Sequence, residues 1–366
     1  MDINMKVNQA LRFRAFYLFF IMGGIQIGVG VIGGPKYIFT HARQDSWISV
    51  LIAYAAILII LWVMLLILKS YDNADIFGIQ ADIFGQWIGK LLGTVYILHF
   101  ALTLFVVLVT YIDLIQLFIF PHLNAWLISF LLLSLVVYCV AGGLRSVIGV
   151  VFLFFLLSHW LWLLMYKPIS LIDASHYQPV LQASMIDLLK GSRESAFTLA
   201  GFEILFVLYP FIQNKKHVWR PLWLGITWSA GILLFSVAVA IGYFSPIQLE
   251  TIEWTVLAML QNVELPFIAR FDFIIVAEWM MIALPTILLY MWATTQGMKR
   301  LYNVPKRVTL YSLALIMAVL SGFIDSHGQV MMLTNFANDM AFWIIFVYPL
   351  VLLPIVKFKK WRQNRK

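Results

Sequence analysis

The chain has 366 residues, of which 63% are hydrophobic, 16% aromatic and only 11% charged. This composition excludes an ordinary soluble domain and is typical of an integral membrane protein in a lipid bilayer. The formal net charge is +8, but the basic residues flank apolar segments and act as topological anchors, so we expect no nucleic-acid partner.

Long apolar segments recur along the whole sequence, separated by short polar breaks. A helix needs about 20 residues to cross the hydrocarbon core of a bilayer. We therefore predict an all-α integral membrane protein with ten transmembrane helices, which form a single polytopic domain over residues 1–366. The ten predicted spans cover residues 14–38, 46–68, 87–119, 122–141, 146–166, 192–213, 219–243, 267–297, 308–323 and 335–356.

The positions of the basic residues predict the orientation of the chain. With the N-terminus in the cytoplasm, most of the 25 Lys and Arg residues fall in cytoplasmic segments, including the basic tail at 357–366. Cytoplasmic loops of membrane proteins carry such an excess. Ten spans then place both termini in the cytoplasm. We expect no cleavable signal peptide, because the first span is long, interrupted by glycines and lacks a small-residue cleavage site.

The first span contains the sequence IGVGVIGGP, from Ile27 to Pro35, which includes four glycines. Glycine weakens a helix interior and allows the backbone to approach a ligand closely. Backbone released from helical hydrogen bonds cannot face lipid, so it must line a cavity enclosed by protein. We interpret these glycines as binding-site backbone. The alternatives are close helix packing through small residues and an ordinary helix end at Pro35.

The third span carries a stripe of polar side chains. Tyr96, His99, Thr103, Thr110 and Asp113 fall within an arc of roughly 100° when residues are placed at helical spacing. Such a stripe predicts a helix face that borders a cavity. Hydrogen bonding between helices would account equally well for any single member.

The sixth span repeats the interruption of the first. In SRESAFTLAGFEILFVLYP, residues 192–210, the pair Gly201 and Glu203 interrupts an apolar run. Breaks in the first span of each set of five predict an inverted-repeat transporter fold, with one repeat over about 14–166 and the second over about 192–356. The two discontinuous helices are expected to meet near the middle of the bilayer.

Ionisable side chains at membrane depth are costly, so each is a candidate functional residue. Glu203, Glu278 and His159 are predicted to lie near the middle of their spans. Each has two interpretations, either as a proton-coupling group or as a structural group hydrogen-bonded inside the bundle. For Glu203 the structural role would be to cap backbone amides that the interruption frees.

Between the seventh and eighth spans, residues 245–266 have apolar side chains at helical spacing but are too polar to cross a membrane. We predict an amphipathic helix over the external mouth of the bundle, with or without a role in gating. The lone Cys139 indicates neither a disulfide nor a Cys/His metal site. We find no nucleophile–base pair or phosphate loop, so we predict no enzyme activity, no cofactor and no metal.

Two of these motifs resemble a known superfamily. IGVGVIGGP is similar to the glycine-rich first-helix break of the amino acid/polyamine/organocation (APC) superfamily, and FTLAGFE, residues 197–203, resembles its sixth-helix break. The resemblance implies the LeuT-like fold of two five-helix repeats, in which first-helix amides hold a substrate carboxylate and sixth-helix carbonyls hold its amino group. It implies an amino acid-sized zwitterion bound between Gly28, Val29, Gly30, Ala200, Gly201 and Phe202.

A narrower resemblance covers essentially the whole chain. GQWIGKLLG at 85–93, PFIARFD at 266–272 and GQVMML at 328–333, in this order, look like the B subunit of spore germination receptors, the GerAB type. The resemblance implies a germinant-sensing subunit in the inner membrane of a dormant endospore, assembled with an A-type membrane subunit and a lipoprotein C subunit.

The same resemblance extends the ligand-binding set beyond the two breaks. It adds His99, Thr103 and Thr286 to the residues already named. His99 departs from the simplest pocket for a small aliphatic amino acid, which leaves open a polar or larger germinant.

Two functions remain open from the sequence. In the first, a small germinant, expected to be an amino acid, binds in the cavity and signals germination through the partner subunits. In the second, the chain is a proton-coupled amino acid permease. A third, an ion-conducting subunit with a vestigial pocket, has little support, because charged pore-lining rings are scarce. The fold does not decide among them.

Overall fold

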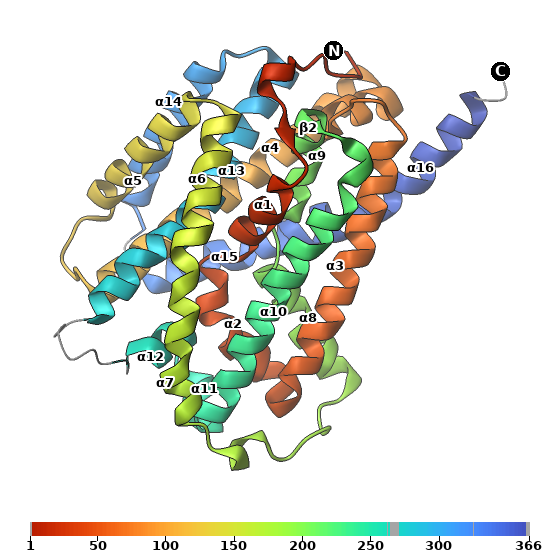
Figure 1. Cartoon of the computed structure of the whole chain (residues 1–366). Coiled ribbons are helices and arrows are strands. Elements are labelled where there is room, and N and C mark those ends of the chain that lie inside the picture. Colours follow the sequence, from red (N-terminus) through yellow and green to blue (C-terminus); the bar gives the residue numbers. More distant parts are fainter. Residues whose placement is uncertain (1, 262, 264–270, 325, 364–366) are drawn as a thin grey trace.

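The computed structural model describes residues 2–261, 263, 271–324 and 326–363, which form a bundle made almost entirely of helices (Figure 1). The two short strands β1 (Phe13–Arg14) and β2 (Ile212–Gln213) pair in parallel. The α-helices are α1 (Tyr17–Gln26), α2 (Gly30–Ala42), α3 (Ser46–Lys69), α4 (Ile76–Phe118), α5 (Ala125–Ala141), α6 (Leu144–Ser158), α7 (Tyr166–Ser170), α8 (Met185–Thr198), α9 (Leu205–Leu208), α10 (Trp219–Tyr243), α11 (Pro246–Thr251), α12 (Thr255–Gln261), α13 (Phe271–Tyr302), α14 (Lys306–Ser321), α15 (His327–Ala341) and α16 (Tyr348–Gln363). Short 3-10 turns are η1 (Gln9–Leu11), η2 (Arg43–Asp45), η3 (His159–Met165), η4 (Ala174–Tyr177), η5 (Phe202–Ile204), η6 (Tyr209–Phe211) and η7 (Lys215–His217), and η8 (Phe342–Val347) is a π-helix.

Each of the ten predicted spans falls on helix, so the structure is consistent with the predicted count. Among the described residues, six helical segments are long and apolar enough to cross a membrane, and the bent pair Met185–Thr198 and Phe202–Phe211 makes a seventh. The six are Gly30–Lys69, Ile76–Phe118, Leu144–Ser170, Lys215–Tyr243, Phe273–Tyr302 and His327–Gln363. The helices α1 and α5 are shorter but also apolar.

The first predicted span is interrupted where its glycines lie. The helix α1 ends at Gln26 and α2 begins at Gly30, so three residues separate the two halves. Pro35 lies inside α2 rather than at its end, which excludes the alternative that the proline terminates the helix.

The sixth predicted span is interrupted at the matching place. The helix α8 ends at Thr198, and the chain resumes as helix at Phe202 with a bend of 52°. Gly201, between the two halves, has a φ of 116°, a left-handed conformation that favours glycine. Both discontinuous helices of the predicted fold are therefore present.

Helix packing follows the predicted two-fold repetition of five spans. The helix α1 of the first span packs on α10 of the seventh, and the equivalent pair, α8 of the sixth and α3 of the second, also packs. Exchanging the first five spans with the last five replaces the fifth span by the tenth and the eighth by the third, so the contact of α6 with α13 corresponds to the contact of α15 with α4. The contacts of α4 with α13 and of α5 with α14 each join two equivalent spans, so the exchange leaves them unchanged. These contacts recur when the two halves are exchanged, which is the pattern of an inverted repeat.

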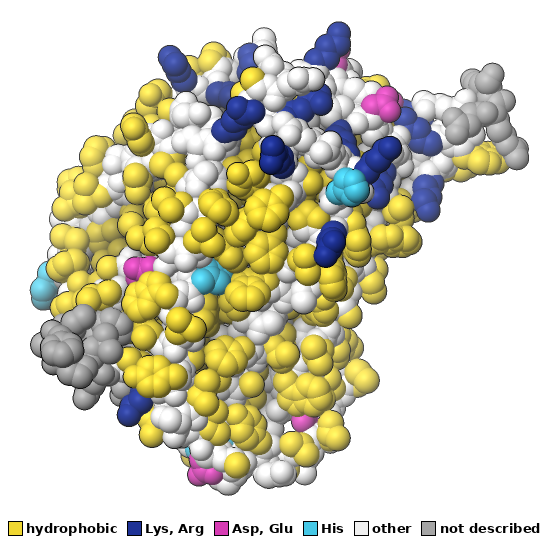
Figure 2. Space-filling model, in the orientation of Figure 1, with side chains coloured by type: hydrophobic (Ala, Val, Ile, Leu, Met, Phe, Trp, Pro, Cys, Tyr) yellow, Lys and Arg dark blue, Asp and Glu magenta, His cyan; other side chains and the backbone are white. Residues whose placement is uncertain are grey.

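The two ends of the chain lie at the same end of the bundle (Figure 1). Lys and Arg side chains gather at this end, and a broad band of hydrophobic side chains lies beyond them (Figure 2). Among the described residues, several large apolar side chains are more than half exposed, including Trp62, Tyr138 and Leu163. A band of this kind is suited to contact with lipid rather than water.

Some boundaries differ from the sequence-based predictions. The third span begins earlier, at Ile76, and Gly85 interrupts it with a φ of 82° and a ψ of 174°. Gly85 opens the motif GQWIGKLLG, and its backbone conformation favours glycine. In the tenth span the helix begins at His327 and contains a π-helical segment, Phe342–Val347.

The predicted amphipathic helix over 245–266 is wrong in form. The structure has two short helices instead, α11 and α12, joined at residues 252–254. The predicted apolar side chains Val256, Met259 and Leu260 are buried where α12 packs against α2 and α13, and Gln261 is exposed. Residue 262 and residues 264–270, including most of the PFIARFD motif, lie outside the described residues.

Candidate functional site

A cavity of about 180 Å³ lies between the two interrupted helices and is also walled by α4, α13 and α15. A protein cavity of about 150 Å³ admits a benzene-sized molecule, so this space is large enough for a small ligand. Of the residues assigned to ligand binding from the sequence, those that line the cavity are Gly28, Val29, Gly30, His99, Thr103, Ala200 and Thr286.

The backbone of the first helix is open to the cavity. Ile27 N donates to Gly23 O at 3.1 Å, and the next helical bonds begin with Val31 N, which donates to Gly28 O at 3.3 Å. Within the described chain, the amides of residues 28–30 make no backbone hydrogen bond. They are therefore unpaired donors at the N-terminus of α2, and such an end favours an anion.

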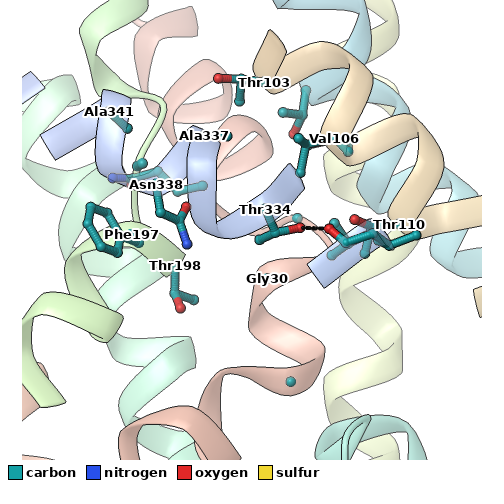
Figure 3. Close-up of a pocket in the computed structure, with 18 of the residues that line it drawn as sticks. Gly30, Thr103, Val106, Thr110, Phe197, Thr198, Thr334, Ala337, Asn338 and Ala341 are labelled. Carbon is teal, nitrogen blue, oxygen red and sulfur yellow. Dashed lines mark hydrogen bonds between the residues drawn. The ribbon is translucent and has the colours of Figure 1, made fainter. Parts of the chain in front are cut away.

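Glycine at position 30 keeps this approach clear. A Cβ at Gly30 would meet its nearest atom, the Cα of Thr198, at 3.7 Å, and the carbonyl oxygen of Thr198 at 3.9 Å. The end of α8 thus faces the beginning of α2 across a narrow gap. Figure 3 shows Phe197 and Thr198, at the end of α8, at the left of the cavity and Gly30 near its middle.

Carbonyl groups freed near the end of α1 are satisfied by side chains from other helices. Thr286 Oγ1 on α13 donates to Ile25 O at 3.2 Å and lies 3.5 Å from Gly24 O. Gln26 Nε2 donates to Leu199 O at 2.6 Å and so joins the two interruptions directly. Gln26 Oε1 is buried without a hydrogen-bond partner, and Gln26 lines the cavity. A ligand donor is the partner that this oxygen lacks.

Glu203 is the centre of a buried hydrogen-bond network. Its Oε1 accepts from Tyr290 OH at 2.7 Å and lies 3.1 Å from His99 Nε2. Its Oε2 accepts from Gly201 N at 2.9 Å. His99 is 1% exposed and Glu203 is completely buried. The carboxylate therefore caps an amide at the interruption and also contacts two side chains that line the cavity.

Glu203 and His99 form a completely buried pair, and Tyr290 OH and Gly201 N supply the other hydrogen bonds to the carboxylate. An unpaired charge would be costly at this depth, whereas a paired and hydrogen-bonded one is tolerated. His99 Nδ1 is buried and lacks a hydrogen-bond partner.

The remaining wall comes from α4 and α15. Figure 3 shows Thr103, Val106 and Thr110 facing Thr334 and Asn338 across the cavity. Thr334 Oγ1 donates to Val330 O at 2.8 Å, so this hydroxyl presents mainly an acceptor to a ligand. Small side chains, Ala337 and Ala341, complete this wall.

A polar cluster closes the cavity at the end occupied by α11 and α12. Glu253, in the turn between these helices, pairs with Lys36 and accepts a hydrogen bond from Tyr37, both on α2. His327 Nδ1 lies 2.8 Å from Asp113 Oδ2 on α4, and its Nε2 lies 4.0 Å from Glu253 Oε1. The short α11–α12 segment is thereby tied to three helices of the bundle.

Four residues assigned from the sequence lie elsewhere. Gly201 and Phe202 do not line the cavity, since Gly201 contacts Ile25 and Phe202 is buried with its ring 6.0 Å from that of Phe346. The other two, Glu278 and His159, lie outside the cavity lining.

The two ionisable groups outside the lining have partners of their own. Glu278 Oε1 accepts from Trp160 Nε1 at 3.0 Å. His159 Nε2 accepts from Trp228 Nε1 at 2.9 Å, and its Nδ1 contacts Phe155 O. Among the residues that the structure describes, no group of three or more His, Cys, Asp or Glu side chains is placed to hold a metal ion.

The sequence reasoning did not identify Gln26, Tyr290 or Asn338 as site residues. Each is a polar side chain inside an apolar stretch, which is a usable signal at membrane depth. Gln26 directly precedes the glycine-rich break, and Asn338 lies near the start of the predicted tenth span. Tyr290 is less conspicuous, because tyrosine is common in apolar helices.

Comparisons with known proteins agree with this architecture. A model of the family described as "Spore germination protein" (Spore_permease) matches residues 12–330. The chain is 28% identical to spore germination protein GerQB of Bacillus cereus, over 92% of this chain and 93% of that protein. It is 21% identical to spore germination protein A2 of Bacillus subtilis (strain 168), over 96% of this chain and 97% of that protein.

Solved structures with a similar fold are transporters. A Na⁺-coupled sialic acid symporter in a substrate-bound, outward-open state matches with a TM-score of 0.65 and 11% identity, over 92% of this chain and 79% of that one. MhsT in complex with L-phenylalanine matches with a TM-score of 0.61 and 14% identity, over 94% and 88% of the two chains. At these identities the likeness shows the fold alone, and it confirms the predicted LeuT-like architecture.

The similar proteins are germination proteins and transporters rather than enzymes. The structure places a cavity at two helix interruptions, where transporters of this fold are interrupted. The chain is therefore a permease-like integral membrane protein, and with a family match over most of its length it belongs to the spore germination protein family.

Proposed function

We propose that this chain is the membrane subunit of a spore germinant receptor that binds an amino acid in the cavity and signals through partner subunits. The observation that carries the proposal is the set of unpaired amides at residues 28–30, which open into the cavity. A carboxylate is the group that a helix N-terminus binds best. The ligand's carboxylate would therefore lie against α2.

The opposite charge of a zwitterion has a matching partner across the gap. The last carbonyls of a helix lack intrahelical partners and favour a cation. The end of α8, at Thr198, faces Gly30, and Ala200 lines the same cavity. Carbonyl oxygens from this segment would accept hydrogen bonds from the ligand's ammonium group. Gln26 Oε1, buried and unpaired, is a further acceptor nearby.

Assembly and location are part of the proposal. Family membership and the similarity to germinant receptor B subunits support an A-type membrane subunit and a lipoprotein C subunit as partners, in the inner membrane of the endospore. The gathering of Lys and Arg at the end that carries both termini supports a cytoplasmic location for that end. We treat residues 1–366 as a single polytopic domain.

A proton-coupled amino acid permease is the second candidate, and the Glu203 network favours it. Glu203, His99 and Tyr290 all line the cavity, so a bound ligand would contact groups that can exchange a proton. Glu278 and His159 have no such contact, so coupling would depend on Glu203 and His99.

Binding followed by uptake separates the two candidates. A panel of radiolabelled amino acids is first tested for binding to the purified full-length protein. Any ligand found is then tested for uptake into proteoliposomes, with and without a pH gradient. Binding without uptake is expected for a receptor. Gradient-driven accumulation would establish a permease, and an absence of amino acid binding when the receptor is assembled with its partners would refute the proposed ligand class.

A further inference from the structure

A second cleft, of about 460 Å³, lies beside the first helix at the end of the bundle that carries the termini. Three segments distant in the sequence form it. These are the N-terminal segment through β1 to the start of α1, the first turns of α6, and β2. The cleft is separate from the ligand cavity, and no residue lines both.

The cleft is strongly basic. Arg12, Arg14 and Arg145 line it, and no Asp or Glu does. Among the described residues, none of the three arginines forms an ion pair with an acid. Arg145 Nη2 donates a hydrogen bond to Arg12 O at 3.3 Å. Arg12 Nε is buried and has no hydrogen-bond partner. Three arginines therefore line one cleft, with no acidic side chain among its described lining residues.

One of these arginines also acts on an amine outside the cleft. Burial is the main cause that lowers the pKa of Lys215 to about 8; the nearby Arg12 guanidinium adds to this shift, and Asp72 opposes it. The positive charge of Arg12 thus extends beyond the cleft lining.

The lower part of the cleft is apolar. Ile148 is buried, Tyr17 is partly buried, and a Cβ at Gly149 would meet open space. Below them, the ring of Phe20 lies 4.7 Å from that of Phe152, and the ring of Phe16, 60% exposed, lies 5.2 Å from that of Phe20. The cleft lining therefore combines arginines with apolar residues, and aromatic side chains of α1 and α6 continue from it, with Phe16 exposed.

We infer that this cleft binds the headgroup of an anionic phospholipid, with the phosphate between the arginines and an acyl chain along the aromatic surface. Guanidinium groups bind phosphate through paired hydrogen bonds. The arginines lie where the apolar helices α1 and α6 begin, at the expected level of lipid headgroups. This position favours a lipid over a soluble phosphate compound.

Occupancy would stabilise one state of the bundle. The cleft includes residues of both strands, which pair as Phe13 with Ile212 and Arg14 with Gln213. This pairing fastens the segment before the first helix to the segment after the sixth. A bound headgroup therefore holds the two discontinuous helices together on the side of the termini.

Lipid retention in nanodiscs tests the inference with the full-length protein. The protein is assembled in phosphatidylcholine discs with or without phosphatidylglycerol, and lipid that remains bound is measured by native mass spectrometry. Thermal unfolding is followed with a thiol-reactive dye, since Cys139 is the sole cysteine and is buried. We expect retained phosphatidylglycerol, a higher unfolding midpoint, and slower amide exchange over residues 13–14.

Two variants remove the site in different ways. Replacing Arg12, Arg14 and Arg145 with Gln removes the charge, and Gly149→Leu fills the apolar floor while keeping every arginine. Each should reduce retention by about 10-fold or more, the effect of about 1.4 kcal/mol. The matched control replaces Lys69, Lys90 and Lys216, exposed residues predicted on the same membrane face, with Gln. It should retain the lipid.

Three results would overturn the inference. The first is equal retention by Gly149→Leu and the unaltered protein. The second is equal loss in the lysine control, which would indicate a diffuse charge effect. The third is stabilisation by inorganic phosphate in phosphatidylcholine discs to the same extent as by phosphatidylglycerol, which would indicate a soluble phosphate ligand instead of a lipid.

Discussion

Replacing Glu203 tests whether its hydrogen bonds hold the interrupted sixth helix in place. The carboxylate accepts from Gly201 N and Tyr290 OH and contacts His99 Nε2, and none of these groups reaches solvent. In Glu203→Ala, all three lose their acceptor. A buried donor left unpaired costs about 1–3 kcal/mol, so the free energy of unfolding should fall by about 3 kcal/mol or more.

Glu203→Gln should be much milder. The Gln oxygen still accepts from Gly201 N, and its NH2 group donates to Tyr290 OH or to His99 Nε2 in the other tautomer. The loss is then about 1 kcal/mol, the difference between a hydrogen bond to a charged and to a neutral acceptor. The two variants should differ by about 2 kcal/mol.

The assay uses the sole cysteine as an internal reporter. Cys139 is 7% exposed, so a thiol-reactive dye reports unfolding of purified protein. We expect the unfolding midpoints to rank as unaltered protein, Glu203→Gln, then Glu203→Ala. If Glu203→Ala unfolds at the same temperature as the unaltered protein, the network does not support the interruption. If Glu203→Gln fails as severely as Glu203→Ala, a fixed negative charge is required.

Three further changes test other parts of the structure. Gly30→Leu should abolish ligand binding without affecting membrane insertion, because the new side chain fills the gap beside Thr198. Gly231→Leu is the control, since a side chain at Gly231 meets open space. If Gly30→Leu still binds ligand, the pocket assignment is refuted. Glu253→Gln should weaken the polar cluster around Glu253 at the α11–α12 end of the cavity. A cysteine placed at Thr334, in a Cys139→Ser background, should then be labelled several-fold faster by a membrane-impermeant thiol reagent. An unchanged labelling rate would exclude gating by this cluster. Because the pKa of Lys215 is lowered from 10.5 to about 8, the unfolded chain holds this proton more tightly, so stability should rise as the pH increases from about 8 towards 10.5. Lys215→Met should remove this rise, measured as unfolding midpoint against pH, and an unchanged rise would contradict the assignment.

The interruptions were predictable because their cause is local. Gly28 and Gly30 destabilise helix wherever they occur, and Gly201 with Glu203 does the same in the matching span. The residues that respond to these breaks were not predictable in the same way. Tyr290 and Gln26 act through partners 87 and 173 residues away, and no spacing within one helix indicates such a partner.

Helix phase explains why some predicted site residues face elsewhere. Ala200, Gly201 and Phe202 were assigned together, but the bend at Gly201 rotates the chain, so Ala200 borders the cavity and Phe202 is buried against Phe346. The depth estimate for Glu278 was reasonable, yet depth does not specify direction, and this side chain pairs with Trp160 outside the cavity lining. A helical wheel fixes relative faces only while the helix is continuous.

The hydrogen bond from Gln26 to Leu199 has a consequence for how the protein can respond. It joins the two hinges of the bundle by one contact, and Gly201 packs on Ile25 beside it. A displacement of either interruption must break this bond or carry the other interruption with it. In the proposed receptor, a ligand that moves one interrupted helix would therefore move the other, and one amide group would carry that coupling.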